Sequence, residues 1–414
     1  MRGMATLARR LESRLNGGTG NIFAAATAMA AEYGSVNLGQ GFPSFPTPDF
    51  VKKCAAVAIT DNHNQYTRPA GNPVLVETLK SIYDPLFNRN LDAMSEIAVC
   101  SGAQEGIYNI LVSFCDEGDT VLCVEPYFDA YKKAADLLGV QTQGVPLRQT
   151  PGATSAGDFK LDVDELDKAI TSKTKVLVLN TPHNPTGKVF TRQELEEIAA
   201  IVRKHPQLVV LSDEVYEFMT FDGLPHERFA LLDGMWDRTI SLFSAGKTFS
   251  CTGWRVGYCI GPAHLVAPLH ETQSIIAFCA PTPLQVGVAR AFETAEEVGY
   301  YESLAATLQA KRDALCSALS AAGMKPIIPQ GGYFVLADTS SLLDEVPVES
   351  ADGVARDVRV NEWLTKKLGI TGIPISGFYS PGNRELSDNV LRFAYCKSDP
   401  EISAAASKLL DASK

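Results

Sequence analysis

The chain has 414 residues, of which 45% are hydrophobic and 21% charged, and it carries a formal net charge of −11 with a pI near 5.1. This length and composition indicate a globular protein with a sizeable core, in two domains or one large composite. The acidic balance argues against nucleic acid or an anionic membrane as a main partner, and the lack of a long apolar run predicts no membrane span.

Residues 1–14 are rich in arginine and contain one acidic residue, Glu12. An arginine-rich, acid-poor start resembles a mitochondrial presequence, whereas its shortness and Glu12 fit an ordinary amphipathic lead-in. Nine scattered cysteines without a Cys-x-x-Cys pair indicate reduced thiols. We therefore predict a cytoplasmic protein, with the mitochondrion as the alternative.

From about residue 96 to residue 262, short apolar runs alternate with helical patterns. A capping box, Thr191 with Glu194, opens one of the helices. Strands are predicted over 120–125, 175–180, 208–212 and 239–243, and helices over 104–114 and 195–204. Continuous apolar strands that alternate with helices predict an α/β fold, in which helices cover both faces of a mostly parallel central sheet. The stretch 141–157, which contains Pro146 and Pro151, is expected to be an irregular surface excursion.

The pattern changes after about residue 290, where helical stretches flank short strands. Helices are predicted over 298–322 and 355–368, and strands over 332–336 and 389–394. This pattern is typical of a smaller α+β domain. We predict three parts: an N-terminal arm (1–50) that packs with the small domain, a large domain (51–290) and a small C-terminal domain (291–414). A cleft between the two domains would hold the site.

Polar side chains follow the predicted strands of the large domain where each strand ends. They are Asn184, Asp213, Tyr216, Ser244 and Lys247. Ligands of parallel α/β sheets bind outside the carboxyl ends of the strands, so position and chemistry agree. An amine, a carboxylate, a phenol and an amide in this order are the groups that hold pyridoxal 5′-phosphate as a lysine Schiff base.

Each of these groups has a chemical role in such a site. Lys247 would bind the cofactor and then move a proton as general base and acid, because burial would depress the pKa of its amine. Asp213 would keep the pyridine nitrogen protonated, and Tyr216 and Asn184 would hydrogen-bond the O3′ oxygen. The six histidines are dispersed, so no metal site is predicted.

The phosphate and the substrate need donors of their own. Ser244, Arg255 and the N-terminus of the helix that opens at Ala103-Gln104 would bind the phosphate. Phe128 would stack on the ring. Arg392, between Leu391 and Phe393, is the candidate for the substrate carboxylate, because a planar guanidinium matches a carboxylate with two hydrogen bonds.

Together these motifs resemble the class I aminotransferases, which are pyridoxal-phosphate enzymes of fold type I. The motifs that carry the resemblance lie at residues 180–188, 212–216, 244–257 and 391–393. Further motifs at residues 36–46, 64–68, 234–238 and 325–334 resemble the branch of kynurenine aminotransferase, glutamine transaminase K and cysteine-S-conjugate β-lyase. Phe23, where this branch often has Trp, and Arg255, where it often has Lys, depart from the pattern.

The resemblance implies a homodimer with shared active sites and a ping-pong transamination of amino acids with 2-oxo acids. Gly41 and Asn184 would contact the substrate carboxylate, Tyr66 would reach the partner subunit's phosphate, and Phe23 and Phe278 would line the side-chain pocket. Kynurenine or glutamine would be the donor, with possible β-lyase activity on cysteine conjugates. The alternatives are a class I enzyme for aromatic, methionine or aspartate donors, a dedicated lyase, and a catalytically silent scaffold.

Overall fold

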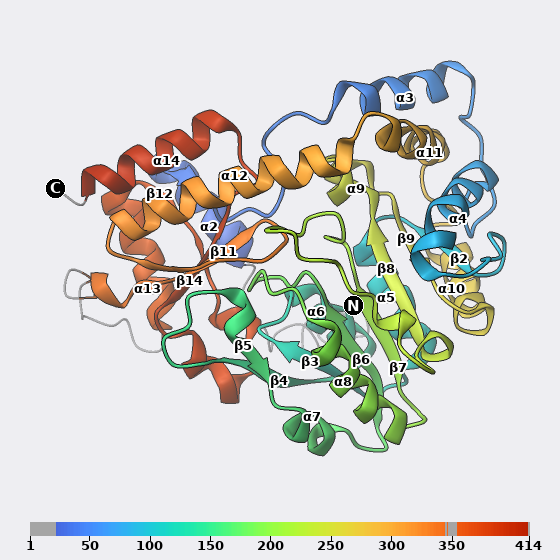
Figure 1. The fold of residues 1–414 in the computed structure, drawn as a ribbon, viewed down its shortest axis with the longest axis horizontal. Coiled ribbons are helices and arrows are strands. Elements are labelled where there is room, and N and C mark those ends of the chain that lie inside the picture. Colours follow the sequence, from blue (N-terminus) through green and yellow to red (C-terminus); the bar gives the residue numbers. More distant parts are fainter. Residues whose placement is uncertain (1–21, 344–345, 347–353, 413–414) are drawn as a thin grey trace, which may run out of the picture.

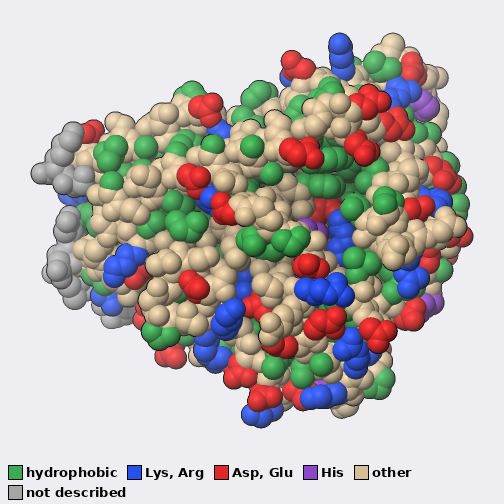
Figure 2. All heavy atoms as spheres, viewed as in Figure 1, with side chains coloured by type: hydrophobic (Ala, Val, Ile, Leu, Met, Phe, Trp, Pro, Cys, Tyr) green, Lys and Arg blue, Asp and Glu red, His purple; other side chains and the backbone are tan. Residues whose placement is uncertain are grey.

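The computed structural model describes residues 22–343, 346 and 354–412 (Figure 1). The arginine-rich stretch 1–14 lies outside these residues, so its role as a targeting signal stays a prediction. No helix of the described part is long and apolar enough to cross a membrane. On the face in Figure 2, acidic and basic side chains are interspersed over most of the surface.

The larger sheet has eight strands in the order β2-β9-β8-β7-β6-β3-β4-β5. Five strands are parallel to one another: β3, β4, β6, β7 and β8. The other three, β2, β5 and β9, pair with their neighbours in the antiparallel sense. The bounds are β2 Ile97–Cys100, β3 Thr120–Glu125, β4 Gln141–Gln149, β5 Phe159–Leu161, β6 Thr174–Asn180, β7 Val209–Asp213, β8 Thr239–Ser244 and β9 Gly257–Ile260. The mostly parallel central sheet is therefore confirmed.

Helices cover both faces of this sheet. Along β3, Leu122 packs in one core cluster with Leu195 of α8, whereas Val121 packs in another with Ile110 of α5. Both faces of the strand are apolar because both are buried. The helices around the sheet are α3 Asp49–Thr60, α4 Pro73–Phe87, α5 Ala103–Phe114, α6 Asp129–Leu138, α7 Val163–Ala169, α8 Arg192–Lys204, α9 Ala245–Thr248, α10 Ala263–Ile276 and α11 Thr282–Glu297.

Strand β4 corrects one expectation. The stretch 141–157 was expected to be irregular, but its first part is a nine-residue strand that pairs with β3. Pro146 is tolerated within it, opposite Glu125. A Cβ on Gly144 would lie 2.1 Å from the carboxyl group of Glu125, so a side chain there would have to displace that carboxyl. Polar residues at the exposed start of the strand hide the apolar pattern that marks the other strands.

The smaller sheet is antiparallel, in the order β10-β11-β14-β13. Its strands are β10 Lys325–Ile327, β11 Phe334–Asp338, β13 Ile373–Pro374 and β14 Val390–Ala394. Helix α12 (Tyr300–Ala321) packs on α14 (Asp399–Ala412) along one side, as Figure 1 shows. Helix α13 (Arg356–Trp363) continues as a π-helix over Leu364–Leu368.

The N-terminal segment joins the C-terminal part of the chain. Strand β1 (Val36–Asn37) pairs in parallel with β12 (Ile370–Thr371). Helix α2 (Ile22–Tyr33) lies beside β12 and β13, and Figure 1 shows this blue helix among the orange and red elements. The division into arm, large domain and small domain at residues 50 and 290 stays our proposal, and α11 runs across the second boundary.

Candidate active site

Three neighbouring parallel strands end in polar residues that face one cavity. Asn180 ends β6, Asp213 ends β7 and Ser244 ends β8. Lys247 follows on the short helix α9, and Tyr216 follows β7. The predicted site residues line this cavity, with two exceptions: it contains Phe23, Gly41, Ala103, Gln104, Phe128, Asn184, Asp213, Tyr216, Ser244, Lys247, Arg255 and Arg392.

The two exceptions are Tyr66 and Phe278. Neither lines the cavity of its own chain; instead their rings contact each other edge to face, with centroids 5.0 Å apart. Tyr66 is 84% exposed and Phe278 44%. The expectation that Phe278 lines a substrate pocket is therefore not met within a single subunit.

Asp213 is buried at the cavity wall, with 3% of its surface exposed. Its Oδ2 accepts a hydrogen bond of 2.6 Å from the Tyr131 hydroxyl, and its Oδ1 accepts one from the backbone N–H of Val215. Burial raises the pKa of this carboxyl to about 6, although both hydrogen bonds and the nearby Lys247 oppose the rise. A carboxylate of this kind is well suited to a buried cationic ring nitrogen.

Lys247 places an amine in the cavity wall. Burial, together with the cations of Arg392 and Arg255, lowers the pKa of its amine to about 8, so a substantial share is neutral near physiological pH. Its Nζ donates hydrogen bonds to the Tyr333 hydroxyl (2.5 Å) and to the carbonyl oxygen of Gly41 (3.2 Å). Tyr333 was not among the predicted site residues, although it lies in the motif at residues 325–334.

Arg392 is a buried cation that also lines the cavity. Its guanidinium donates to Oδ1 of Asn184 (3.1 Å) and to the carbonyl oxygen of Gly39 (2.9 Å). It lies 4.0 Å from the ring centroid of Phe334, which the sequence analysis had not selected for the site. Its Nε is buried without a hydrogen-bond partner among the described residues. An unsatisfied buried donor at this place fits an anionic group of a ligand.

Arg255 lies at the start of α5, where the two together could bind an anion. Arg255 lies so close to Gly102 that a Cβ there would be 2.3 Å from a guanidinium nitrogen. Gly102, with φ of 83°, is the residue before the N-terminus of α5. The free N–H groups of that terminus, Arg255 and the Ser244 hydroxyl provide the donors that a phosphate needs.

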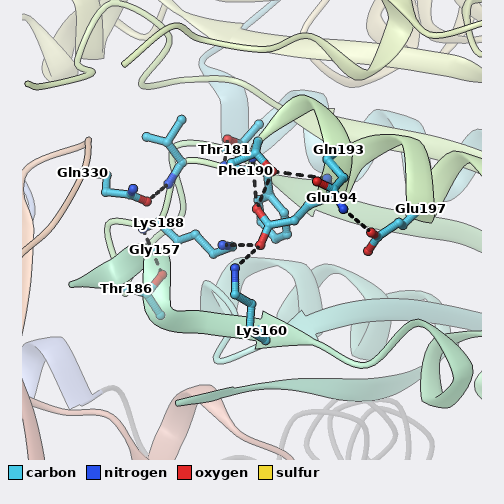
Figure 3. A network of polar contacts seen from close by, with 12 residues as sticks. Gly157, Lys160, Thr181, Thr186, Lys188, Phe190, Gln193, Glu194, Glu197 and Gln330 are labelled. Carbon is cyan, nitrogen blue, oxygen red and sulfur yellow. Dashed lines mark hydrogen bonds and ion pairs between the residues drawn. The ribbon is translucent and has the colours of Figure 1, made fainter. Parts of the chain in front are cut away.

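The turn between β6 and α8 is braced by an ion network that joins buried Lys188 and exposed Lys160 through Glu194 (Figure 3). Lys188, with 1% of its surface exposed, donates to Oε1 of Glu194 at 2.9 Å, and Lys160 donates to the same oxygen at 3.0 Å. Glu194 also completes the predicted capping box with Thr191. Asn180 accepts from the backbone N–H of Asn184 across this turn. This hydrogen bond from Asn184 to Asn180 helps to hold the Asn184 side chain beside Arg392.

A second buried network lies behind Asp213. Arg228 pairs with Glu214 (2.6 Å) and with Glu217 (2.5 Å), and His226 contacts Glu214. Glu214 keeps a pKa of about 2, because Arg228 and His226 outweigh the effect of its burial. Among the described residues, no group of His, Cys, Asp and Glu side chains could hold a metal ion. All nine cysteines are free.

Comparison with known proteins identifies the family of this chain. The sequence pattern described as "Aminotransferase class I and II" matches residues 34–409. The chain belongs to the class I and II aminotransferases. This family implies pyridoxal phosphate as cofactor, and the buried Asp213, the amine of Lys247 and the two anion sites fit that group.

Two relatives and one solved structure show how close the similarity is. Kynurenine–oxoglutarate transaminase of Dictyostelium discoideum is 43% identical, over 93% of this chain and 92% of the relative. Human kynurenine–oxoglutarate transaminase 1 is 37% identical, over 97% of this chain and 98% of the relative. The crystal structure of Bna3p from Saccharomyces cerevisiae superposes with a TM-score of 0.91 at 34% identity, covering 95% of this chain and 96% of that one.

Proposed function

We propose that this aminotransferase transfers the amino group of kynurenine, glutamine or an aromatic amino acid to a 2-oxo acid, with pyridoxal phosphate bound at Lys247. The observation that carries the proposal is the shared cavity of Lys247, Asp213 and Arg392. It combines a nucleophilic amine, a buried carboxylate and a carboxylate receptor. The names of the relatives support the choice of kynurenine.

Pyridoxal phosphate supplies an aldehyde that bonds to amines and a ring that withdraws electrons. Asp213 would stabilise the positive charge of its ring nitrogen, and Tyr216 and Asn184 would hydrogen-bond its oxygen. Arg255, Ser244 and the N-terminus of α5, with Ala103 and Gln104, would hold the phosphate, and Phe128 would lie against the ring.

The substrate would be bound on the other side of the cavity. Arg392 would bind its carboxylate with help from Asn184 and the backbone at Gly41. Lys247 would accept the proton from Cα and return it to the carbon that was the aldehyde carbon of the cofactor, on the other side of the amino nitrogen. Phe23 and Phe334 offer apolar surface to an aromatic side chain. The amino group then passes to a second oxo acid in the same cavity, which makes the reaction ping-pong.

The functional unit in this proposal is a homodimer with shared active sites. Tyr66 and Phe278 form an exposed aromatic pair outside their own cavity, beside the exposed Ile275. In a dimer Tyr66 would contact the partner's phosphate, and Phe278 would line the partner's side-chain pocket. Light scattering of the purified protein tests this: a monomer that turns over substrate would overturn it.

We further propose a cytoplasmic location, with the mitochondrion as the alternative that residues 1–14 leave open. Imaging the full chain with a C-terminal fluorescent tag distinguishes the two. Loss of a mitochondrial signal after replacing Arg9 and Arg10 by Gln would favour the alternative.

The visible absorbance spectrum tests the function directly. We expect a band from lysine-bound pyridoxal phosphate in the native protein, and loss of this band when kynurenine is added. Lys247→Ala should lack the band and lose at least about 10²-fold in rate, because it removes both the covalent anchor and the proton carrier.

Other outcomes would favour the alternatives. A band that responds only to methionine, aspartate or other donors would change the proposed substrate. Pyruvate and ammonia formed without an oxo acid would indicate a lyase. A protein with no band after added cofactor would be a silent scaffold.

A further inference from the structure

Tyr333 contacts the reactive lysine from behind the cavity wall. It lies just before β11, in the small antiparallel sheet region, and only 1% of its surface is exposed. Its hydroxyl accepts a hydrogen bond from Nζ of Lys247 and donates one of 2.7 Å to the carbonyl oxygen of Gly41. Lys247 also donates to that carbonyl. The three polar groups therefore form a closed triangle.

The carbonyl oxygen of Gly41 can only accept, and it receives hydrogen bonds from the Tyr333 hydroxyl and from Lys247. Lys247 also donates to the Tyr333 hydroxyl. These contacts hold Nζ between Tyr333 and Gly41, at the cavity that Lys247 and Gly41 line.

We infer that Tyr333 is a positioning residue for Lys247: together with the carbonyl of Gly41 it holds Nζ at the place in the cavity from which the amine would exchange a proton with the substrate. This role rests on the proposed transamination. The proton leaves Cα for Nζ, the electron pair of the C–H bond stays with the substrate and its cofactor, and Nζ returns the proton. No other reactant is needed.

The triangle joins three separate parts of the chain. Gly41 follows strand β1 of the N-terminal segment, Tyr333 belongs to the smaller sheet region and Lys247 to α9 beside the larger sheet. Tyr333 also lies with its ring edge-on to Tyr216, at 4.9 Å between centroids. The orientation of the amine therefore depends on the correct placement of all three parts.

Tyr333→Phe tests this role, with Tyr395→Phe as the matched control. Tyr395 is equally buried and donates to a backbone carbonyl, that of Gly332 at 3.1 Å, so its replacement removes a similar bond next to Tyr333 that does not involve the Lys247 amine. Both variants should keep the visible band. Tyr333→Phe should lower kcat by roughly 10- to 100-fold with little change in KM, because the base is misaligned and not lost. The isotope effect with a Cα-deuterated donor should rise, because proton transfer becomes slower than the other steps.

A second measurement does not depend on turnover. The rate at which the cofactor-free full chain recombines with pyridoxal phosphate reports the protonation of Lys247, whose amine is also faced by Cys396, Arg392, Asp213 and Arg255. Tyr333 is an acceptor for the charged amine, so Tyr333→Phe should move the midpoint of this pH profile below that of the native protein. Tyr395→Phe should leave the midpoint unchanged.

The outcomes separate the two proposals. If the native protein is active and Tyr333→Phe matches it, or if both variants lose activity equally with unchanged isotope effects, the role of Tyr333 is overturned and the function stands. If the native protein forms the band but no amino acid removes it, the proposed function fails, and the role of Tyr333 fails with it.

Discussion

The hydroxyl of Tyr131 donates a hydrogen bond of 2.6 Å to Oδ2 of Asp213. Tyr131 is itself buried on α6, so this bond fixes the plane of the carboxylate from one side. The bond does not fully offset the burial, because the pKa of Asp213 remains raised to about 6. The ionised form of Asp213 therefore lowers the free energy of unfolding of the protein.

Asp213→Asn is expected to stabilise the cofactor-free protein while it impairs the enzyme. The folded pKa of about 6 exceeds the ordinary value of 3.8, so ionised Asp213 destabilises the fold above pH 6, and this cost vanishes as the pH falls toward 4. The shift corresponds to about 3 kcal/mol at pH 8. Urea unfolding at pH 8 and pH 5 should show a gain that is larger at pH 8. A variant that is equally destabilised at both values would contradict the assignment.

Arg392→Lys should weaken binding of the amino donor and leave the cofactor in place. A lysine ammonium cannot make the paired hydrogen bonds of a guanidinium, and loss of one charged hydrogen bond costs about 1.5–3 kcal/mol, or roughly 10- to 100-fold in KM. Titration of the visible band with donor measures the effect. Arg312→Lys, which replaces another buried arginine that pairs with Asp222, is the control and should keep the native KM. Unchanged donor affinity in Arg392→Lys would remove this residue from the carboxylate site.

Arg228→Met should destabilise the fold by about 3–5 kcal/mol, because it leaves Glu214 and Glu217 buried without their cation. The loss should be smaller at pH 5 than at pH 7, since protonation of the two carboxyls relieves the repulsion. Urea midpoints at both pH values measure it. Arg203→Met, at an exposed arginine that contacts the backbone of Asp233, should change stability by less than about 0.5 kcal/mol. Equal losses in the two variants would count against the buried network.

Gly144→Ala should disturb the contact between Glu125, the last residue of β3, and Asn383 of the C-terminal region. The added Cβ would displace the carboxyl of Glu125, whose Oε2 accepts from Asn383. Overpacking of this kind costs about 1–3 kcal/mol. Gly253→Ala is the control, because nothing lies within 4 Å of its Cβ position and its φ is not positive. Thermal unfolding of both variants provides the comparison, and equal Tm values would show that Glu125 moves aside freely.

The parallel strands β3, β6, β7 and β8 of the larger sheet and most of the candidate site could be predicted from the sequence, for a common reason. Continuous apolar runs mark the strands that are buried on both faces, and the residues at their ends carry the chemistry. Asp213 and Ser244 are the last residues of two such strands. The capping box of Thr191 and Glu194 could also be predicted, because it depends only on residues close together in the sequence. The structure contains it.

What the sequence could not reveal depends on contacts between distant segments. Tyr131 and Tyr333 look like ordinary core residues until the fold brings them to Asp213 and Lys247. The strand β4 lacks an apolar pattern at its polar, exposed start, so the stretch 141–157 was misjudged. Tyr66 and Phe278 lie outside the cavity of their own chain, and only a second subunit could complete their roles.

The pairing of β1 with β12 has a consequence for how such an enzyme diversifies. Several of the proposed cofactor ligands follow the carboxyl ends of strands in the larger sheet, whereas Gly39 and Gly41 follow β1 and Arg392 lies on β14 of the smaller sheet. Because β12 is followed directly by β13 of the smaller sheet, the pairing of β1 with β12 ties the two glycines to Arg392. Mutations near this pairing should therefore change the choice of amino acid more readily than the binding of the cofactor, with Asn184 as the residue that serves both.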